Sequence, residues 1–235
     1  MRGKVDGKIM LMLGVLVLFF LSWLLFNRNQ YQAVSLGLAT AACLPFYYRY
    51  EKKQLNIKEL VLIAVLTTTA VSGRVVFYLI PAVTPMTALI ILTGICMGAE
   101  VGFLVGSLSA VTSNILFGQG PWTPFQMFSW GVIGLLAGLP FVRHQLQKHY
   151  WLLSAYGIFA GLFFSFFMDV WTVFSLDHAF SWPRYAALLV TAAPFTLTYC
   201  AANVFFSCLL LRTFQSRLQR ILIKYNIRAE MERKK

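Results

Sequence analysis

Long apolar runs constrain this chain more than any other feature of its sequence. Of its 235 residues, 59% are hydrophobic and only 12% are charged, and the mean hydropathy is +0.70. A helix needs about 20 apolar residues to cross the hydrocarbon core of a bilayer, and runs near that length recur along the whole chain. The sequence therefore predicts an all-α, polytopic membrane protein. Its long candidate spans are 9–26, 31–48, 59–80, 125–142, 151–174 and 185–211.

The apolar segment 86–117 is too long to be one span. As a single helix it would measure about 48 Å, whereas the hydrocarbon core is about 30 Å thick. Gly98 lies near its middle, followed by Ala99 and Glu100. We therefore predict two short helices, 86–97 and 100–117, that turn at Gly98.

The distribution of positive charge predicts the topology. The net charge is +12, but the Lys and Arg residues cluster in short flanks between apolar runs. The positive-inside rule explains this pattern, so nucleic-acid binding is not needed to account for the charge. The basic loops 49–58 and 143–150 are both expected in the cytoplasm, which requires an even number of crossings between the spans that they flank. The prediction is eight helices in the cell membrane with both termini cytoplasmic, and with the loops 81–85, 118–124 and 176–184 outside.

The chain shows no pattern of catalytic, cofactor-binding or metal-binding residues. His144 and His149 lie in a predicted cytoplasmic loop and His178 lies in an outer one, so the three histidines cannot converge. No glycine-rich nucleotide-binding loop is present. The cysteines lie in apolar runs without metal-ligand spacing. We predict a protein that is not an enzyme, has no cofactor or metal, and depends on a partner for energy.

The segment 118–130 is the most unusual stretch of the chain. Its sequence, GQGPWTPFQMFSW, places two glycines, two prolines and two tryptophans beside polar side chains. Proline and glycine interrupt a helix, and an irregular polar segment beside a membrane span is tolerated where it lines a cavity. We interpret this segment as the outward-facing edge of a binding pocket.

Two ionisable residues within the predicted spans are candidates for that pocket. Arg74 and Asp169 lie at similar depths in the outer halves of spans 59–80 and 151–174. Charged groups are costly in lipid and usually face the interior of a bundle. They could line the pocket, or they could form an ion pair that holds the two helices together.

Four further residues are predicted to line the pocket. Asn114 precedes the irregular segment, Gln126 follows it, and Trp122 and Trp171 could form its walls. The alternatives are an interhelical hydrogen bond for Asn114 and a place in the interfacial aromatic belt for the tryptophans. Tyr199, in the last span, could equally pack or line the site.

Small residues follow one face of span 59–80. Ala64, Thr68 and Ser72 recur every fourth residue, which permits close approach of another helix. Packing within the bundle is one reading of this stripe, and docking of a partner is the other.

These features resemble the substrate-binding S component of an energy-coupling factor (ECF) transporter. The resemblance covers about 59–213 as a six-helix core. This leaves a two-helix N-terminal extension and loop at 1–58. The basic residues of the tail at 214–235 predict a cytoplasmic extension of the last helix. The PAVTPMTA, GQGPWTPFQMFSWGVIGLLAG and AYGIFAG runs resemble the cobalamin subgroup, with the second run the most specific.

The resemblance implies a division of labour. The chain would capture cobalamin from outside. A membrane coupling subunit with two ATP-binding subunits would then drive reorientation of the chain. The stripe of Ala64, Thr68 and Ser72 would be the face on which the coupling subunit docks. An S component for another small molecule, such as a queuosine precursor or another vitamin, remains an alternative. A stand-alone secondary carrier is less favoured, because no convincing repeat relates the two halves.

Overall fold

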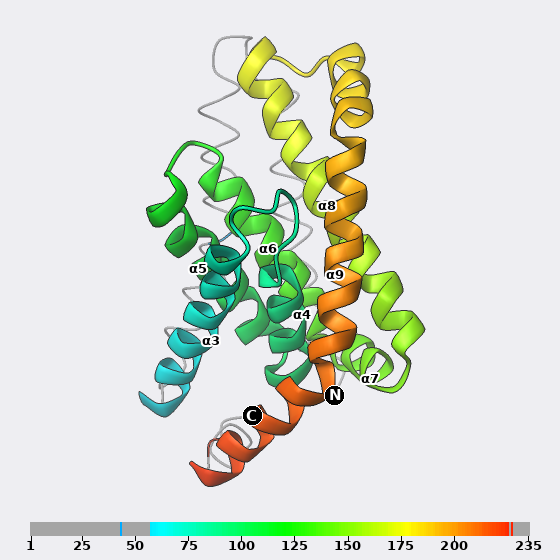
Figure 1. The fold of residues 1–235 in the computed structure, drawn as a ribbon. Helices are drawn as coiled ribbons and strands as arrows, with labels where there is room; N and C mark the ends of the chain where they lie inside the picture. Colours follow the sequence, from blue (N-terminus) through cyan, green and yellow to red (C-terminus); the bar gives the residue numbers. More distant parts are fainter. Residues whose placement is uncertain (1–42, 44–56, 226, 228–235) are drawn as a thin grey trace, which may run out of the picture.

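The computed structural model describes residues 43, 57–225 and 227, and all the regular secondary structure in this part of the chain is helical (Figure 1). The predicted all-α membrane fold is thereby confirmed. The predicted spans 9–26 and 31–48 lie outside the described residues, apart from Cys43. The described helices are α3 (Ile57–Val76), α4 (Met86–Met97), α5 (Ala99–Phe117), α6 (Thr123–Ala137), α7 (Pro140–Lys148), α8 (Tyr150–Asp177) and α9 (Trp182–Lys224).

Four of the described helices are long and apolar enough to cross a membrane, namely α3, α5, α8 and α9. The predicted span 125–142 differs from the structure at its end. The helix α6 stops at Ala137, and α7 begins at Pro140 after a bend of 73°. Proline lacks an N–H and disfavours helical geometry in the residue before it, and Leu139 is accordingly extended. The two helices could form one span only as this bent pair.

The predicted break at Gly98 is confirmed. The helix α4 ends at Met97 and α5 begins at Ala99, and Gly98 has a φ of 98°, a conformation that side chains rarely adopt. A Cβ added at Gly102 of α5 would lie 2.9 Å from the Cα of Gly94 in α4, so the chain folds back on itself at Gly98, as the topology argument requires.

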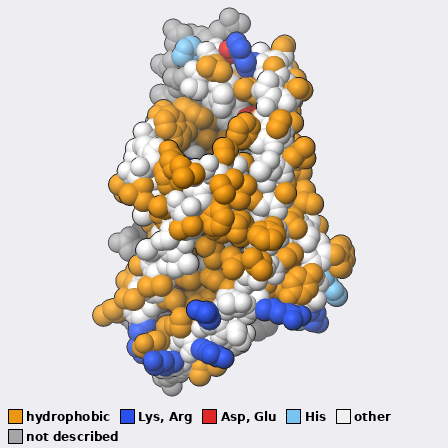
Figure 2. All heavy atoms as spheres, in the orientation of Figure 1, with side chains coloured by type: hydrophobic (Ala, Val, Ile, Leu, Met, Phe, Trp, Pro, Cys, Tyr) orange, Lys and Arg blue, Asp and Glu red, His pale blue; other side chains and the backbone are white. Residues whose placement is uncertain are grey.

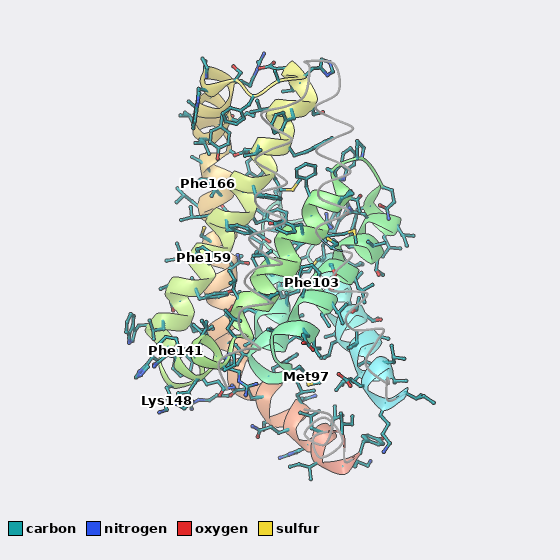
Figure 3. The ribbon with its side chains drawn as sticks, turned by 180° about the vertical axis from the view of Figure 1, so that it is seen from behind. Met97, Phe103, Phe141, Lys148, Phe159 and Phe166 are labelled. Carbon is teal, nitrogen blue, oxygen red and sulfur yellow. The ribbon has the colours of Figure 1, made fainter. Side chains whose placement is uncertain are left out.

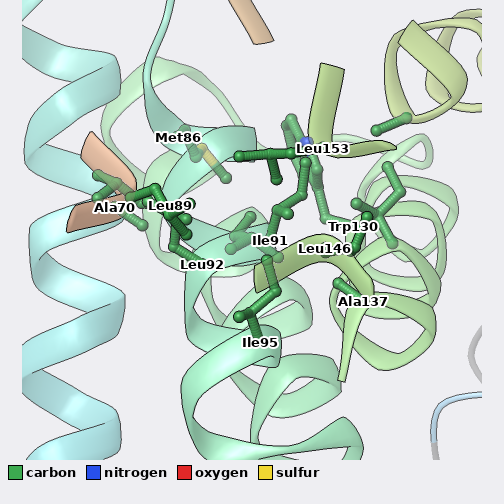
Figure 4. Close-up of a cluster of buried hydrophobic side chains, with 14 of the residues drawn as sticks. Ala70, Met86, Leu89, Ile91, Leu92, Ile95, Trp130, Ala137, Leu146 and Leu153 are labelled. Atoms are coloured by element: carbon green, nitrogen blue, oxygen red, sulfur yellow. The ribbon is translucent and has the colours of Figure 1, made fainter. Parts of the chain in front are cut away.

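The helix α4 forms the centre of the bundle rather than a complete span. Its 12 residues rise only about 18 Å, too short to cross alone. Every residue of α4 except Cys96 is buried. Ile91, Leu92 and Ile95 pack with residues of neighbouring helices such as Ala70 and Trp130 (Figure 4). The irregular segment 77–85 connects α3 to α4 and lies above α4 in Figure 1.

The helices α5 and α6 approach each other closely at glycines. A Cβ atom added at Gly102 would collide with the backbone of Gly134, and one added at Gly134 would collide with the backbone of Gly102. A Cβ at Gly106 would likewise meet the backbone of Trp130. Small residues permit this kind of backbone contact between membrane helices, and we call these three positions the glycine seam.

The helices α8 and α9 form a long antiparallel pair that rises above the other helices in Figure 1. The helix α9 continues through the predicted boundary at 213 and ends at Lys224. The apolar side chains of Leu218 and Leu222 explain the continuation, because they belong to a buried cluster that includes Leu62 and Leu66 of α3. The C-terminal part of α9 is therefore packed on one side and is not a wholly solvated tail.

The surface carries charge and apolar groups in separate zones. Lys and Arg side chains gather at the lower end of the face in Figure 2, while hydrophobic side chains cover its middle. From behind, Phe159 and Phe166 lie along the exposed side of α8, and Lys148 lies at the same lower end (Figure 3). This arrangement is typical of a membrane protein with one basic aqueous face.

The predicted topology can be tested by labelling. Gln119 lies ahead of α6 and Gln147 lies in α7, and both residues are exposed. Because basic loops remain cytoplasmic, single-cysteine variants at the two positions are expected to react with an impermeant thiol reagent from opposite sides of the membrane. Labelling of both from the same side would contradict the topology. Leu209, which is exposed on α9 within the predicted span 185–211, gives a control position that lipid is expected to shield.

Candidate functional site

A cavity of about 360 Å³ lies where α3, α6, α8 and α9 meet the irregular segment 77–85. Small-molecule sites typically occupy 300–1,000 Å³ and combine apolar walls with a few polar groups. This cavity has that character. Its polar or charged lining residues are Arg74, Tyr78, Thr84, Gln126, Ser165, Asp169, Thr196 and Tyr199, and its larger apolar ones include Phe77, Trp130, Phe164, Met168 and Phe195.

Arg74 lines the cavity from the last turn of α3. Its Nη1 donates to Ser113 Oγ at 2.6 Å and to Asn114 Oδ1 at 3.3 Å. The guanidinium carbon also lies 4.9 Å from the ring centre of Phe117 and 5.6 Å from that of Trp130. Cation–π contacts of this kind stabilise an arginine that is partly removed from water. These contacts hold the guanidinium group of Arg74 in place at the cavity wall.

Asn114 connects Arg74 to the segment 118–130 through hydrogen bonds but does not itself line the cavity. Its side chain is 1% exposed. While Oδ1 accepts from Arg74, Nδ2 donates to Thr123 Oγ1 at 2.9 Å and to Gln126 Oε1 at 2.8 Å. Thr123 in turn donates to Gln119 Oε1 at 2.9 Å. We call Arg74, Ser113, Asn114, Thr123 and Gln126 the polar network; it fixes both Arg74 and Gln126 at the cavity wall.

A second set of hydrogen bonds forms at the cavity wall around Trp130. The indole Nε1 donates to Thr87 Oγ1 at 3.0 Å and to Tyr199 OH at 3.1 Å, and Thr87 and Tyr199 also bond each other. The Trp130 ring stacks on Phe164 at 4.6 Å. Four helices, α4, α6, α8 and α9, are thereby joined at one point.

Asp169 lines the cavity from α8 without forming the alternative ion pair. No ion pair joins it to Arg74 within the described residues. Its Oδ2 atom is buried and has no hydrogen-bond partner in the described part of the chain. Buried polar atoms are nearly always satisfied, so this one requires a physical reason.

Trp122 and Trp171 lie outside the cavity lining. Trp122 immediately precedes α6, is 38% exposed and closes over Gly120. Trp171 is buried against Phe125, with ring centres 4.9 Å apart. Because two residues correspond to more than half a helical turn, Asp169 and Trp171 face different directions on α8.

The cavity includes residues that were not among the six predicted lining positions. Helical spacing was a usable signal for them, because residues four apart share a face. Trp130 lies four residues after Gln126, and Ser165 lies four residues before Asp169. Starting from the polar candidates and moving one helical turn would have found both.

The stripe of small residues faces away from the bundle. Ala64, Thr68 and Ser72 are exposed on α3, whereas Leu66 and Ala70 face the core. Thr68 Oγ1 donates to the Ala64 carbonyl at 2.9 Å, which satisfies the hydroxyl within its own helix.

The fold and the cavity together describe a polytopic helical protein with a cavity of the size and polarity that small-molecule sites have. Residues 58–223 match the family described as "ECF transporter, substrate-specific component", and the chain belongs to this family. Comparisons with curated proteins and with solved structures give no significant match. The chain is therefore a membrane-embedded, substrate-specific subunit of an ECF transporter, a transport family and not a family of enzymes.

Proposed function

We propose that this subunit captures its substrate in the cavity between α3, α6, α8 and α9. A membrane coupling subunit and two ATP-binding subunits then drive its reorientation. The observation that carries the proposal is the cavity itself, since it combines apolar walls with Arg74, Gln126 and Asp169. These three residues would contact the substrate, and Asn114 would hold two of them in position.

Cobalamin is the first candidate substrate. The support is the motif at 118–130, which resembles the cobalamin subgroup and whose Gln126 reaches the cavity. Amide and phosphate groups on cobalamin suit neutral hydrogen-bonding side chains together with one arginine. Trp122, which is 38% exposed, is proposed to contact the protruding part of so large a ligand, which this cavity could enclose only in part, and the buried Trp171 is proposed to support this wall through Phe125.

A smaller substrate is the second candidate, and the volume of the cavity favours it. About 360 Å³ lies near the lower end of the range for small-molecule sites. A compact vitamin or nucleobase-like precursor would fit without protruding.

Two measurements test the proposal. Affinity purification of the full chain from its native membrane is expected to bring a membrane coupling subunit and ATPase subunits with it. Titration of the purified chain against cobalamin and a panel of smaller vitamins is expected to give one tight ligand. A chain that brings no ATPase subunit and binds none of these compounds would contradict the proposed function.

The exposed stripe on α3 is the proposed docking face for the coupling subunit. Replacing Thr68 with tryptophan is expected to prevent assembly of the complex, because a bulky ring prevents close helix approach. Binding of substrate to the isolated chain should be unchanged, since Thr68 does not line the cavity. Co-purification and ligand titration measure the two effects separately. Thr191→Trp, at an exposed position of α9, is the matched control; an intact complex with Thr68→Trp would contradict the docking face.

A further inference from the structure

We propose that the substrate is an amphoteric small molecule with an apolar ring between two groups of opposite charge. Its anionic group lies against Arg74, and its protonated nitrogen lies against Asp169. This inference rests on the proposed function and selects its smaller-substrate candidate.

Arg74 retains donors for a ligand. Both of its hydrogen bonds within the described residues use Nη1, so Nε and Nη2 have no protein acceptor there. An arginine can donate two parallel N–H bonds to a carboxylate or phosphate. The polar network fixes one side of the guanidinium, and the rest of the group is available at the cavity wall.

Asp169 supplies the opposite charge from a different wall. It belongs to α8, whereas Arg74 belongs to α3, and both residues line the same cavity. Its Oδ2 atom is buried and has no hydrogen-bond partner among the described residues, while the half-buried side chain as a whole reaches the cavity. Tyr185, whose hydroxyl donates to the Phe166 carbonyl, does not satisfy it. An unpaired carboxylate that is partly removed from water is costly, so a ligand that brings a cation to the accessible part of Asp169 reduces that cost on binding.

The surfaces between the two charges are apolar or already hydrogen-bonded. Phe77, Phe164 and Met168 contribute apolar surface to the cavity. Ser165 and Thr196 bond each other at 2.6 Å, so their hydroxyl groups do not need the ligand. An aromatic or other apolar body suits such walls, and the volume of about 360 Å³ limits its size.

A matched trio of probes tests the inference on the purified full-length chain. The compound 4-(aminomethyl)benzoate carries both charges, 4-methylbenzoate carries only the anion, and 4-methylbenzylamine carries only the cation. At equal concentrations, the doubly charged probe is expected to raise the midpoint of thermal unfolding most. Equal or greater stabilisation by either singly charged probe, or no stabilisation by any of the three, would overturn the inference.

Variants identify the groups responsible. Asp169→Asn is expected to lower affinity for 4-(aminomethyl)benzoate roughly tenfold or more, to the level of 4-methylbenzoate, because the ion pair is lost. Arg74→Gln is expected to lower it to the level of 4-methylbenzylamine. The matched controls are Asp177→Asn and Arg184→Gln, which break an exposed ion pair of 3.0 Å outside the cavity and should leave binding unchanged.

The design separates failure of the inference from failure of the proposed function. Arg74 belongs to the polar network, so replacing it could also disturb the fold. Asp169 bonds no described residue through Oδ2, so Asp169→Asn should leave the fold intact and is sufficient by itself to test the inference. Unchanged affinity in Asp169→Asn would overturn the inference even if the chain still purifies with its ATPase subunits. Absence of those subunits would instead count against the proposed function.

Discussion

Replacing Asn114 with leucine is expected to abolish substrate binding and to destabilise the fold by about 3 kcal/mol. The side chain is buried and bonds Arg74, Thr123 and Gln126, so leucine would remove three hydrogen bonds at once. Arg74 would keep its bond to Ser113, and Thr123 would keep its bond to Gln119. Each buried polar group left unsatisfied costs about 1–3 kcal/mol, and more when it is charged. Thermal unfolding in detergent measures the loss of stability, and ligand titration of the folded fraction measures the loss of binding.

Ile115→Leu is the control for this substitution. Ile115 follows Asn114 on α5 but is exposed, so its variant should behave like the parent. If Asn114→Leu bound the ligand with parental affinity, the polar network would not position Arg74 and Gln126.

Trp130→Ala is expected to lower the free energy of unfolding by about 3–5 kcal/mol, as for other buried aromatic side chains replaced by alanine. The indole is 3% exposed, stacks on Phe164 and bonds Thr87 and Tyr199. The substitution also removes part of the cavity wall, so binding should be lost with it. Trp130→Phe retains a ring and should lose only about 1–3 kcal/mol for the hydrogen bonds.

Trp182→Ala provides the comparison for an exposed indole. Trp182 is 72% exposed at the start of α9, and its loss should change stability by no more than about 0.5 kcal/mol in detergent. Equal effects at Trp130 and Trp182 would contradict a structural role for Trp130.

The sequence was sufficient to predict the helical membrane fold and the break at Gly98. Both follow from strong local signals, because apolar length defines a membrane helix and a glycine amid a long apolar run permits a turn. The end of α6 was predicted less well. The signal at Pro140 was present, but the apolar run around it obscured the boundary between α6 and α7. The helical extension beyond 213 was predicted and continues to Lys224, but the burial of Leu218 and Leu222 depends on tertiary contacts that sequence alone does not reveal.

The candidate site was predicted in part. Arg74, Gln126 and Asp169 line one cavity, and Asn114 lies directly behind it. The tryptophans were harder to assign, because an indole in the core, at the interface or in a pocket has the same sequence signature. Their roles in binding stay predictions until the substrate is known.

The glycine seam between α5 and α6 has a consequence for how this protein can change over generations. Glycine has no smaller replacement, so every substitution at Gly102 or Gly134 adds atoms where backbones already touch. Any substitution at these glycines can therefore only push α5 and α6 apart. The cavity-lining side chains of α8 and α9 lie away from the seam and can become larger or smaller. The same scaffold can thus acquire a new ligand by substitutions in α8 and α9 while the spacing of α5 and α6 is conserved.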